Sequence, residues 1–557
     1  MLRTVRPVVF ALLVAQIASV CQAKAYPCRW VFVSNSLGSE KDVNDVERIV
    51  KTASEHGLNG MLLTAGLDHI DRQPPEFPGR LARVKATCDK LGIEIIPCIF
   101  SIGYGGDVLT YNRNLAAGIP VRDAPFVVKD GEAHLDPDRA VRIANGGFEE
   151  HDGDRLKGYG FHDKPGDVSF VDSTVFHSGK ASLRFEGFGR YEYGHGRVMQ
   201  QVAVQPGRCY RVSCWVKTEG LEPANSFHVL VLGEDGRDLA PYVPGVIPPG
   251  QWRRIVMGFN SLDRDKVNIY AGVWEGKAGR LWIDDLEVQE VALLNVLRRP
   301  GTPVTVRSER TGEVYEEGRD YGPIRDEQLD FRFDHEPPAI KLLPGGRIHE
   351  GDRLKVSYYH GMGIYDGQVT ACMSEPEVYE IWTKQAELLH KHLAPAKYLL
   401  SMDEVRAGGS CQACKSRNLS MAQILGDCIT KQVAILRKVN PKAEVFIWSD
   451  MLDPNQNAHG DYYLVEGDFT GSWEYVPKDL RIVCWYFDIC DKSLGFFSSH
   501  GFQTLAGAYY DGDTLDNPRG WLDALDKTPN AIGIMYTTWE NKYELLAPFG
   551  DLVIDRW

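Results

Sequence analysis

Two adjacent carboxylates, Asp403 and Glu404, directly follow the apolar run 398–402. Neighbouring residues of a strand point to opposite faces, but at the end of a strand both can turn to one side. Two carboxylates held close together raise the pKa of one, which can then serve as a general acid. Alternatively, Glu404 pairs with Arg406 in a solvated loop. We favour acid–base chemistry, because an acidic pair at the end of a buried strand costs desolvation energy.

Aromatic residues and further carboxylates follow other apolar runs in the same way. They are Tyr104, Trp448, Asp450, Trp485, Tyr486, Asp488, Tyr509, Trp539 and Glu540, and we add His360 at the end of the run 355–360. Aromatic faces pack against sugar rings, and carboxylates supply the acid and base for glycosidic cleavage. This set predicts a binding site for an oligo- or polysaccharide.

The apolar runs that would position these residues alternate with amphipathic helical segments. Strand candidates lie at 30–33, 60–63, 93–99, 355–360, 398–402, 445–448, 482–485, 504–509 and 532–536. Continuous apolar runs are typical of parallel strands covered on both faces. Setting 355–360 aside as accessory leaves eight strands, so we predict an α/β fold, a (β/α)₈ TIM barrel. Its active site would lie at the C-terminal strand ends. A doubly wound open sheet is the rival, but the chain has no Gly-rich phosphate loop.

The strand–helix alternation stops after the third strand, where about 145 residues hold short alternating strands separated by turns. This pattern predicts an all-β jelly-roll sandwich inserted into the barrel. The expected organisation is a signal peptide at 1–25, barrel at 26–141, sandwich at 142–290, a β-rich bridging segment at 291–352 and barrel again at 353–557. Capping boxes are expected at Ser374/Glu377 and Ser420/Gln423.

The first 25 residues have the pattern of a secretory signal peptide. Arg3 and Arg6 precede an apolar run from 8 to 20, and Ala23-Lys24-Ala25 resembles a cleavage site. We therefore expect a secreted or periplasmic protein, and the sequence before Cys21 is a poor lipid-attachment motif. The sequence after residue 25 has no run of 18 apolar residues, so no membrane partner is predicted. The net charge of −14 argues against a nucleic-acid partner.

Cys411 and Cys414 form the one CxxC pair of the chain. A zinc site needs four ligands, and no second CxxC or HxxxH motif completes one. A local disulfide or structural pair is therefore favoured over a metal site or redox catalysis, and no metal is predicted.

The inserted segment resembles a known group of modules. The stretches NGGFEE, YRVSCWVKTEGL, GQWRRIVMGF and LWIDDLEV, in this order over 142–290, are similar to carbohydrate-binding modules of families 4, 9, 16 and 22. The resemblance implies sugar binding through exposed rings, for which Trp252, Trp274 and Tyr191 are candidates, unless these rings fill the core. It also implies a structural calcium ion near the first motif; no other cofactor is expected.

The second half resembles a catalytic domain. YLLSMDE, VFIWSDM, IVCWYFD and GIMYTTWENKYE are similar to the barrel of glycoside hydrolase family 20 and its relatives, families 84 and 123. The resemblance implies retaining hydrolysis of an N-acetylhexosaminide, assisted by the substrate's own acetamido group. Glu404 would protonate the leaving oxygen and Asp403 would orient the acetamido group. Trp448, Trp485 and Trp539 would enclose the sugar, and Glu540 would hold its distal hydroxyls.

The chain departs from this family at two places. The His-x-Gly-Gly motif that precedes the acidic pair is replaced by residues 399–402, and Ser34-Asn35-Ser36 stands where an Arg is expected after the first strand. We expect a secreted β-N-acetylhexosaminidase-like glycoside hydrolase. A two-carboxylate retaining glycosidase with Glu540 as nucleophile and a non-catalytic polysaccharide-binding protein are the alternatives.

Overall fold

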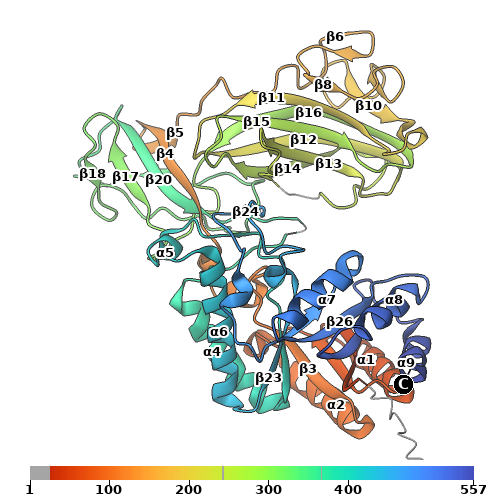
Figure 1. The fold of residues 1–557 in the computed structure, drawn as a ribbon. Helices are drawn as coiled ribbons and strands as arrows, with labels where there is room; N and C mark the ends of the chain where they lie inside the picture. The colour runs from red at the N-terminus through yellow and green to blue at the C-terminus, as the bar shows by residue number, and fades with distance from the viewer. Residues whose placement is uncertain (1–25, 241–243, 366, 557) are drawn as a thin grey trace, which may run out of the picture.

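The computed structural model describes residues 26–240, 244–365 and 367–556. The predicted signal peptide and Cys21 lie outside the described residues. Three β-structures make up the molecule (Figure 1): a barrel surrounded by helices, a two-sheet sandwich, and a smaller sheet beside the sandwich. Each has its own cluster of buried apolar side chains.

Eight parallel strands close into a barrel, which confirms this part of the predicted fold. In spatial order they are β1 (Cys28–Ser34), β2 (Gly60–Thr64), β3 (Glu94–Ile99), β21 (Lys397–Leu400), β23 (Glu444–Trp448), β25 (Arg481–Cys484), β26 (Gln503–Tyr509) and β27 (Ala531–Thr537). The barrel closes because β1 pairs with both β2 and β27. Large side chains such as Trp30, Phe446 and Leu505 fill its interior, so only its ends can bind a ligand.

The longer helices cover the outside of the barrel (Figure 1), and two helices of four residues lie in loops. The helices are α1 (Glu40–Glu55), α2 (Phe77–Leu91), α3 (Gly106–Leu109), α4 (Pro376–Leu393), α5 (Gln412–Lys415), α6 (Met421–Val439), α7 (Cys490–Ser499), α8 (Asp516–Leu525) and α9 (Leu546–Asp555). The capping box predicted at Ser420 and Gln423 is confirmed at the start of α6. The box predicted at Ser374 is wrong: Glu375 caps α4 without a side-chain hydrogen bond, because Pro376 begins the helix one residue later. No helix in the described ranges is long and apolar enough to cross a membrane.

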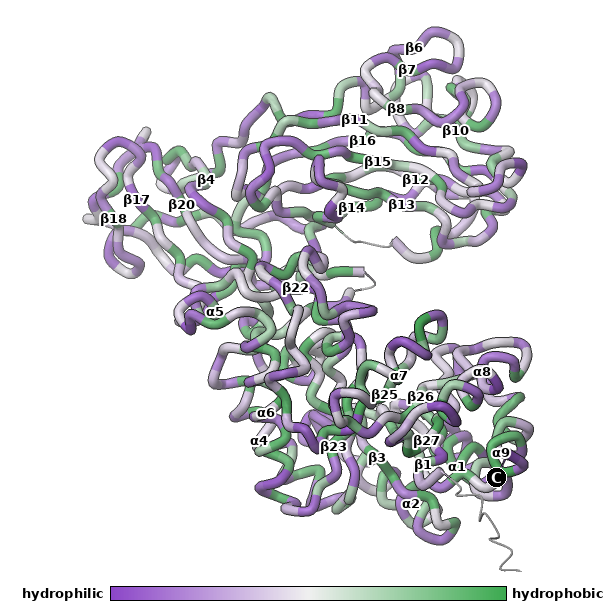
Figure 2. The backbone as a smooth tube through the Cα atoms, viewed as in Figure 1, coloured by the Kyte–Doolittle hydropathy of each residue, from purple (hydrophilic) through white to green (hydrophobic). Residues whose placement is uncertain are grey.

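The inserted segment forms two antiparallel sheets. One contains β14 (Arg253–Asn260), β12 (Cys209–Glu222), β16 (Ala278–Val291), β10 (Ser182–Glu186) and β9 (Ser169–Asp172). The other contains β13 (Phe227–Gly233), β15 (Lys266–Val273), β11 (Gly196–Ala203) and β8 (Phe161–His162). Apolar and polar residues alternate along these strands (Figure 2), so one face of each sheet supplies the sandwich core. A short hairpin of β6 (His151–Asp152) and β7 (Arg155–Leu156) stands apart.

A separate six-stranded sheet lies beside the sandwich (Figure 1). Its strands are β18 (Val314–Tyr315), β17 (Thr305–Ser308), β20 (Arg353–His360), β4 (Ile119–Lys129), β5 (Glu132–Leu135) and β19 (Ile340–Lys341). The run 355–360, set aside from the barrel by the sequence, is part of β20. By contrast, β4 and β5 fall in the range expected to belong to the barrel, yet they lie in this sheet, where β4 pairs with β20.

Candidate active site

A cavity of about 230 Å³ opens at the C-terminal ends of the barrel strands. We call it the barrel-mouth cavity, and its lining residues are Tyr104, Asp403, Glu404, Trp448, Trp485, Tyr510 and Trp539. Six of these seven residues belong to the predicted site, and they come from the ends of five different strands. The cavity therefore brings a carboxylate pair and five aromatic rings to the end of the barrel where enzymes of this fold carry out their chemistry.

The backbone at Glu404 explains how two consecutive acidic residues reach one cavity. Glu404 has a φ of +50°, a left-handed conformation that is uncommon for a residue other than glycine. This conformation breaks the strand alternation, so Glu404 lines the same cavity as Asp403. Gly103 makes the turn possible: a Cβ atom there would lie 2.1 Å from the carbonyl oxygen of Asp403. Such strain is common at functional sites.

Two neighbours hold the carboxylate of Glu404. The hydroxyl of Tyr104 donates to Oε2 at 2.6 Å, and Nη2 of Arg406 lies 2.7 Å from Oε1. The pairing of Glu404 with Arg406 that the sequence left open is therefore present. It is not a solvated surface pair, however, because Arg406 is buried and Glu404 lines the cavity. The pair fixes where Glu404 points.

Arg406 is itself held by a second layer of side chains. Its guanidinium lies 4.4 Å from the ring centre of Tyr365 and 5.2 Å from that of Tyr463, and it donates to Oε1 of Gln368. Gln368 in turn donates to the carbonyl oxygens of Gly103, at 3.0 Å, and Glu404, at 2.8 Å. No sequence signal marked Gln368, which lies in a segment without regular structure. This layer leaves Glu404 little freedom to move.

Asp450 lies behind the cavity and does not line it. Its Oδ2 accepts hydrogen bonds from the backbone N–H of Glu404, at 2.8 Å, and from the amide of Asn457, at 2.9 Å. Its Oδ1 accepts one from the indole of Trp485 at 3.4 Å. Burial, opposed by the hydrogen bond from Glu404, raises the pKa of Asp450 to about 6. Predicted to contact substrate, Asp450 instead positions two residues that line the cavity.

Asp403 has the most perturbed carboxyl group of the cavity. Burial, followed by the charges of Asp450 and Glu404, raises its pKa to about 7. Its Oδ1 accepts a hydrogen bond of 3.0 Å from the hydroxyl of Ser401. A carboxyl group that titrates near neutral pH within a cavity is typical of a functional site.

Ionisation of Asp403 should destabilise the folded protein as the pH rises from about 4 to about 7. Its folded-state pKa of about 7 exceeds the ordinary value of 3.8, so stability is lost as the pH rises through that interval. We expect Asp403→Asn to be more stable than the native chain, with an advantage larger by on the order of 2 kcal/mol at pH 8 than at pH 5. Denaturant unfolding at both pH values measures this. The exposed Asp89→Asn is the control, and an advantage independent of pH would contradict the assignment.

Aromatic rings enclose the cavity. The rings of Trp485 and Tyr510 are parallel to within 5°, with centres 6.1 Å apart. The ring of Trp539 lies 6.3 Å from those of both Trp448 and Tyr510. Tyr510 is the lining residue that the sequence missed; its neighbour Tyr509 was predicted instead. Flat walls of this kind suit the apolar faces of a sugar ring.

Five other predicted residues lie outside the cavity. Tyr509 is buried and its ring stacks on Tyr536 at 4.1 Å, while Tyr486 and Asp488 are exposed to solvent. Glu540 is also exposed, and its carboxylate pairs with Lys542 at 2.7 Å. His360 is fully buried against Asn260, at 3.1 Å, and burial lowers its pKa to about 4. The structure does not bring these five side chains to the carboxylate pair.

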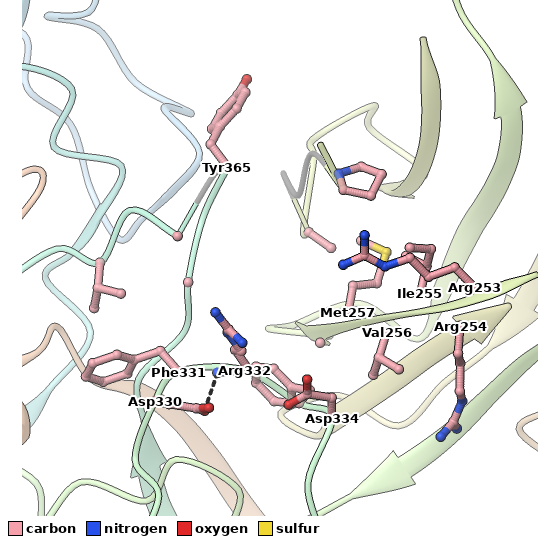
Figure 3. Close-up of a pocket in the computed structure, with 17 residues that line it drawn as sticks. Arg253, Arg254, Ile255, Val256, Met257, Asp330, Phe331, Arg332, Asp334 and Tyr365 are labelled. Carbon is pink, nitrogen blue, oxygen red and sulfur yellow. Dashed lines mark hydrogen bonds between the residues drawn. The ribbon is translucent and has the colours of Figure 1, made fainter. Parts of the chain in front are cut away.

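A larger cavity of about 640 Å³ lies beside the sandwich (Figure 3). Strand β14 forms one wall with Arg253 and Arg254. The other is formed by residues 330–334 together with Gly363, Tyr365, Gly367 and Val369. None of the predicted site residues lines it. The barrel-mouth cavity is smaller, but it is the candidate active site because it holds the carboxylate pair that acid–base chemistry needs.

The acidic side chains near the first motif of the sandwich accept hydrogen bonds from neighbouring residues. Oε1 of Glu149, in the first motif, accepts the backbone N–H groups of Lys180 and Ala181 at 2.7 and 3.2 Å. Asp285 accepts the hydroxyl of Ser178 at 2.6 Å. Within the part of the sandwich that the structure describes, no three His, Cys, Asp or Glu ligand atoms come together. The calcium ion in the sandwich stays a prediction.

The fold and the cavity define a (β/α)₈-barrel protein with a carboxylate and aromatic site, and comparison with known proteins adds the nature of the insert. A family profile described as "Carbohydrate binding domain" matches residues 142–276. No curated protein matches the chain. This domain supports the predicted saccharide partner.

Solved structures similar to parts of this chain include two carbohydrate-binding modules. A family 4 module is 16% identical and covers 27% of this chain and 99% of its own, with a TM-score of 0.20. A family 61 module in complex with β-1,4-galactotriose is 17% identical. The match covers 28% of this chain and 100% of the module, with a TM-score of 0.20. A chitobiase from Flavobacterium johnsoniae is 9% identical, with a TM-score of 0.36; the match covers 95% of this chain and 48% of the chitobiase.

Proposed function

We propose that this chain is a glycoside hydrolase whose active site is the barrel-mouth cavity. The observation that carries the proposal is the meeting of Asp403 and Glu404 with five aromatic rings at the C-terminal end of the barrel. Glycosidic cleavage uses a carboxyl pair next to the scissile bond, and the rings offer walls for the sugar. The carbohydrate-binding domain at 142–276 supports a glycan as substrate.

Within this class we propose retaining hydrolysis of an N-acetylhexosaminide, as the resemblance to family 20 implies. Glu404 donates a proton to the leaving oxygen while the acetamido oxygen attacks the anomeric carbon. The positive charge that develops on the acetamido group faces Asp403, whose carboxylate orients and stabilises it. Glu404 then takes a proton from the water that opens the cyclic intermediate. Each step uses a residue that lines the cavity.

A substrate screen tests the reaction and the sugar together. Purified chain is assayed on aryl N-acetylglucosaminides and N-acetylgalactosaminides and on the matching plain glucosides and galactosides. Because a plain sugar lacks the internal nucleophile, kcat/KM should favour the acetamido substrates by at least about 10²-fold. A preference for plain sugars would exclude substrate assistance. Glycan binding without turnover of any substrate would instead identify a binding protein.

A further inference from the structure

Three cysteine thiols meet in a buried cluster outside the barrel-mouth cavity. Cys372 lies in the segment before α4, Cys411 caps the short helix α5, and Cys414 lies within it. Their sulfur atoms are separated by 3.6 Å (Cys372 to Cys411), 3.8 Å (Cys372 to Cys414) and 3.6 Å (Cys411 to Cys414). All three side chains are buried. The fold thus adds to the CxxC pair a third thiol that lies 39 residues before Cys411.

We propose that Cys372, Cys411 and Cys414 bind a zinc ion. A tetrahedral zinc with Zn–S bonds of about 2.3 Å places its sulfur ligands about 3.8 Å apart. The three sulfur atoms already form a nearly equilateral triangle of this size. A disulfide would instead bring one pair to about 2.05 Å and leave the third thiol apart. The even spacing favours a shared metal over a bond between two of the three.

Charged side chains lie beside the cluster. Nη2 of Arg299 lies 4.0 Å from Sγ of Cys411, and its side chain is 4% exposed. Oε1 of the buried Glu375 has no hydrogen-bond partner among the described residues, although it pairs with Nη1 of Arg299 at 3.3 Å.

The binding step can be written in full. The thiols of Cys372, Cys411 and Cys414 release their protons to solvent, and the three sulfur atoms each form a bond to Zn²⁺. Water occupies the fourth position. The metal would join the segment before α4 to the segment that follows Asp403 and Glu404. Its role would therefore be to stabilise the fold. The site does not depend on the proposed hydrolase activity.

Metal analysis of the full chain tests the site. Purified under reducing conditions and supplied with Zn²⁺, then freed of excess metal, the chain should hold one zinc per molecule by plasma mass spectrometry. Cys372→Ser and Cys411→Ser should lose it. Cys428→Ser, which removes a buried thiol from α6, should keep it. Zinc at background level in the unaltered chain, or equal loss in Cys428→Ser, would overturn the proposal.

A second measurement uses the unaltered chain, since a serine variant can fail to fold. Replacing the metal with Co²⁺ should produce thiolate-to-cobalt charge-transfer bands in the near ultraviolet and tetrahedral d–d bands in the visible. Peptide mapping without reduction should find all three thiols unpaired after zinc is removed. Absence of the charge-transfer bands, or a disulfide between any two of the three cysteines, would show that the cluster is not a metal site.

Discussion

Replacing Glu404 with Gln should lower kcat on an aryl N-acetylhexosaminide by about 10²–10⁴-fold, the usual contribution of a general acid–base group. The amide has nearly the shape of the carboxyl group and can still accept the hydrogen bond from Tyr104, so the cavity should persist. It cannot donate a proton to the leaving oxygen. KM should change little, because the rings that enclose the sugar stay in place.

Glu540→Gln is the matched variant, because it makes the same chemical change at a carboxylate outside the cavity. Glu540 is exposed and paired with Lys542, so we expect less than a few-fold change in kcat. The two-carboxylate mechanism, in which Glu540 is the nucleophile, requires a loss as large as that of Glu404→Gln. A large loss in Glu540→Gln with near-native turnover in Glu404→Gln would reject our assignment.

The barrel could be predicted from the sequence because its strands are continuous apolar runs bounded by helices. Both faces of a parallel strand are buried, so β3 and β26 contain few polar residues. The six-stranded sheet gave no comparable signal. Its strand β4 alternates buried and exposed residues and pairs with β20, which lies more than 200 residues later in the chain. Local sequence patterns carry no information about a pairing over this distance. The range 26–141, which includes β4, was therefore predicted to belong to the barrel.

The site was predicted where strand ends follow ordinary geometry and missed where the backbone departs from it. Tyr509, Tyr510 and Asp511 all have positive φ values, of 81°, 57° and 61°. This turn directs Tyr509 into the protein against Tyr536 and leaves Tyr510 to line the cavity. No periodicity predicts three left-handed residues in succession.

The sequence also did not predict contacts between residues that are far apart in the chain. Gln368 and Tyr365 hold Arg406 from a segment far along the chain from β21, and Cys372 completes the triangle with Cys411 and Cys414 in the same way. A search of the sequence for a second CxxC or HxxxH motif fails here because the third thiol is single. Closeness in the fold, rather than spacing in the chain, brings these residues together.

The pH dependence of kcat/KM should have an ascending limb with a midpoint near pH 7. The proposed mechanism needs an ionised Asp403 to face the cationic acetamido intermediate, and kcat/KM reports groups of the free protein. Burial, with the charges of Asp450 and Glu404, raises the pKa of Asp403 to about 7. Below that value the ionised fraction falls tenfold per pH unit, so the rate at pH 5 should be about 50- to 100-fold below its plateau.

Two variants test whether the ascending limb reports the ionisation of Asp403. In Asp403→Asn, kcat/KM should be low and flat across pH 5 to 7, because no carboxylate can form at that position. In Asp450→Asn the midpoint should move to lower pH, because the charge that raises the pKa of Asp403 is gone. Because Asp403 and Asp450 titrate together, the midpoint pH describes the pair. The change in midpoint between the native chain and the variant is therefore what the experiment measures. An unchanged limb in Asp403→Asn would show that another group controls activity and would remove Asp403 from the proposed mechanism.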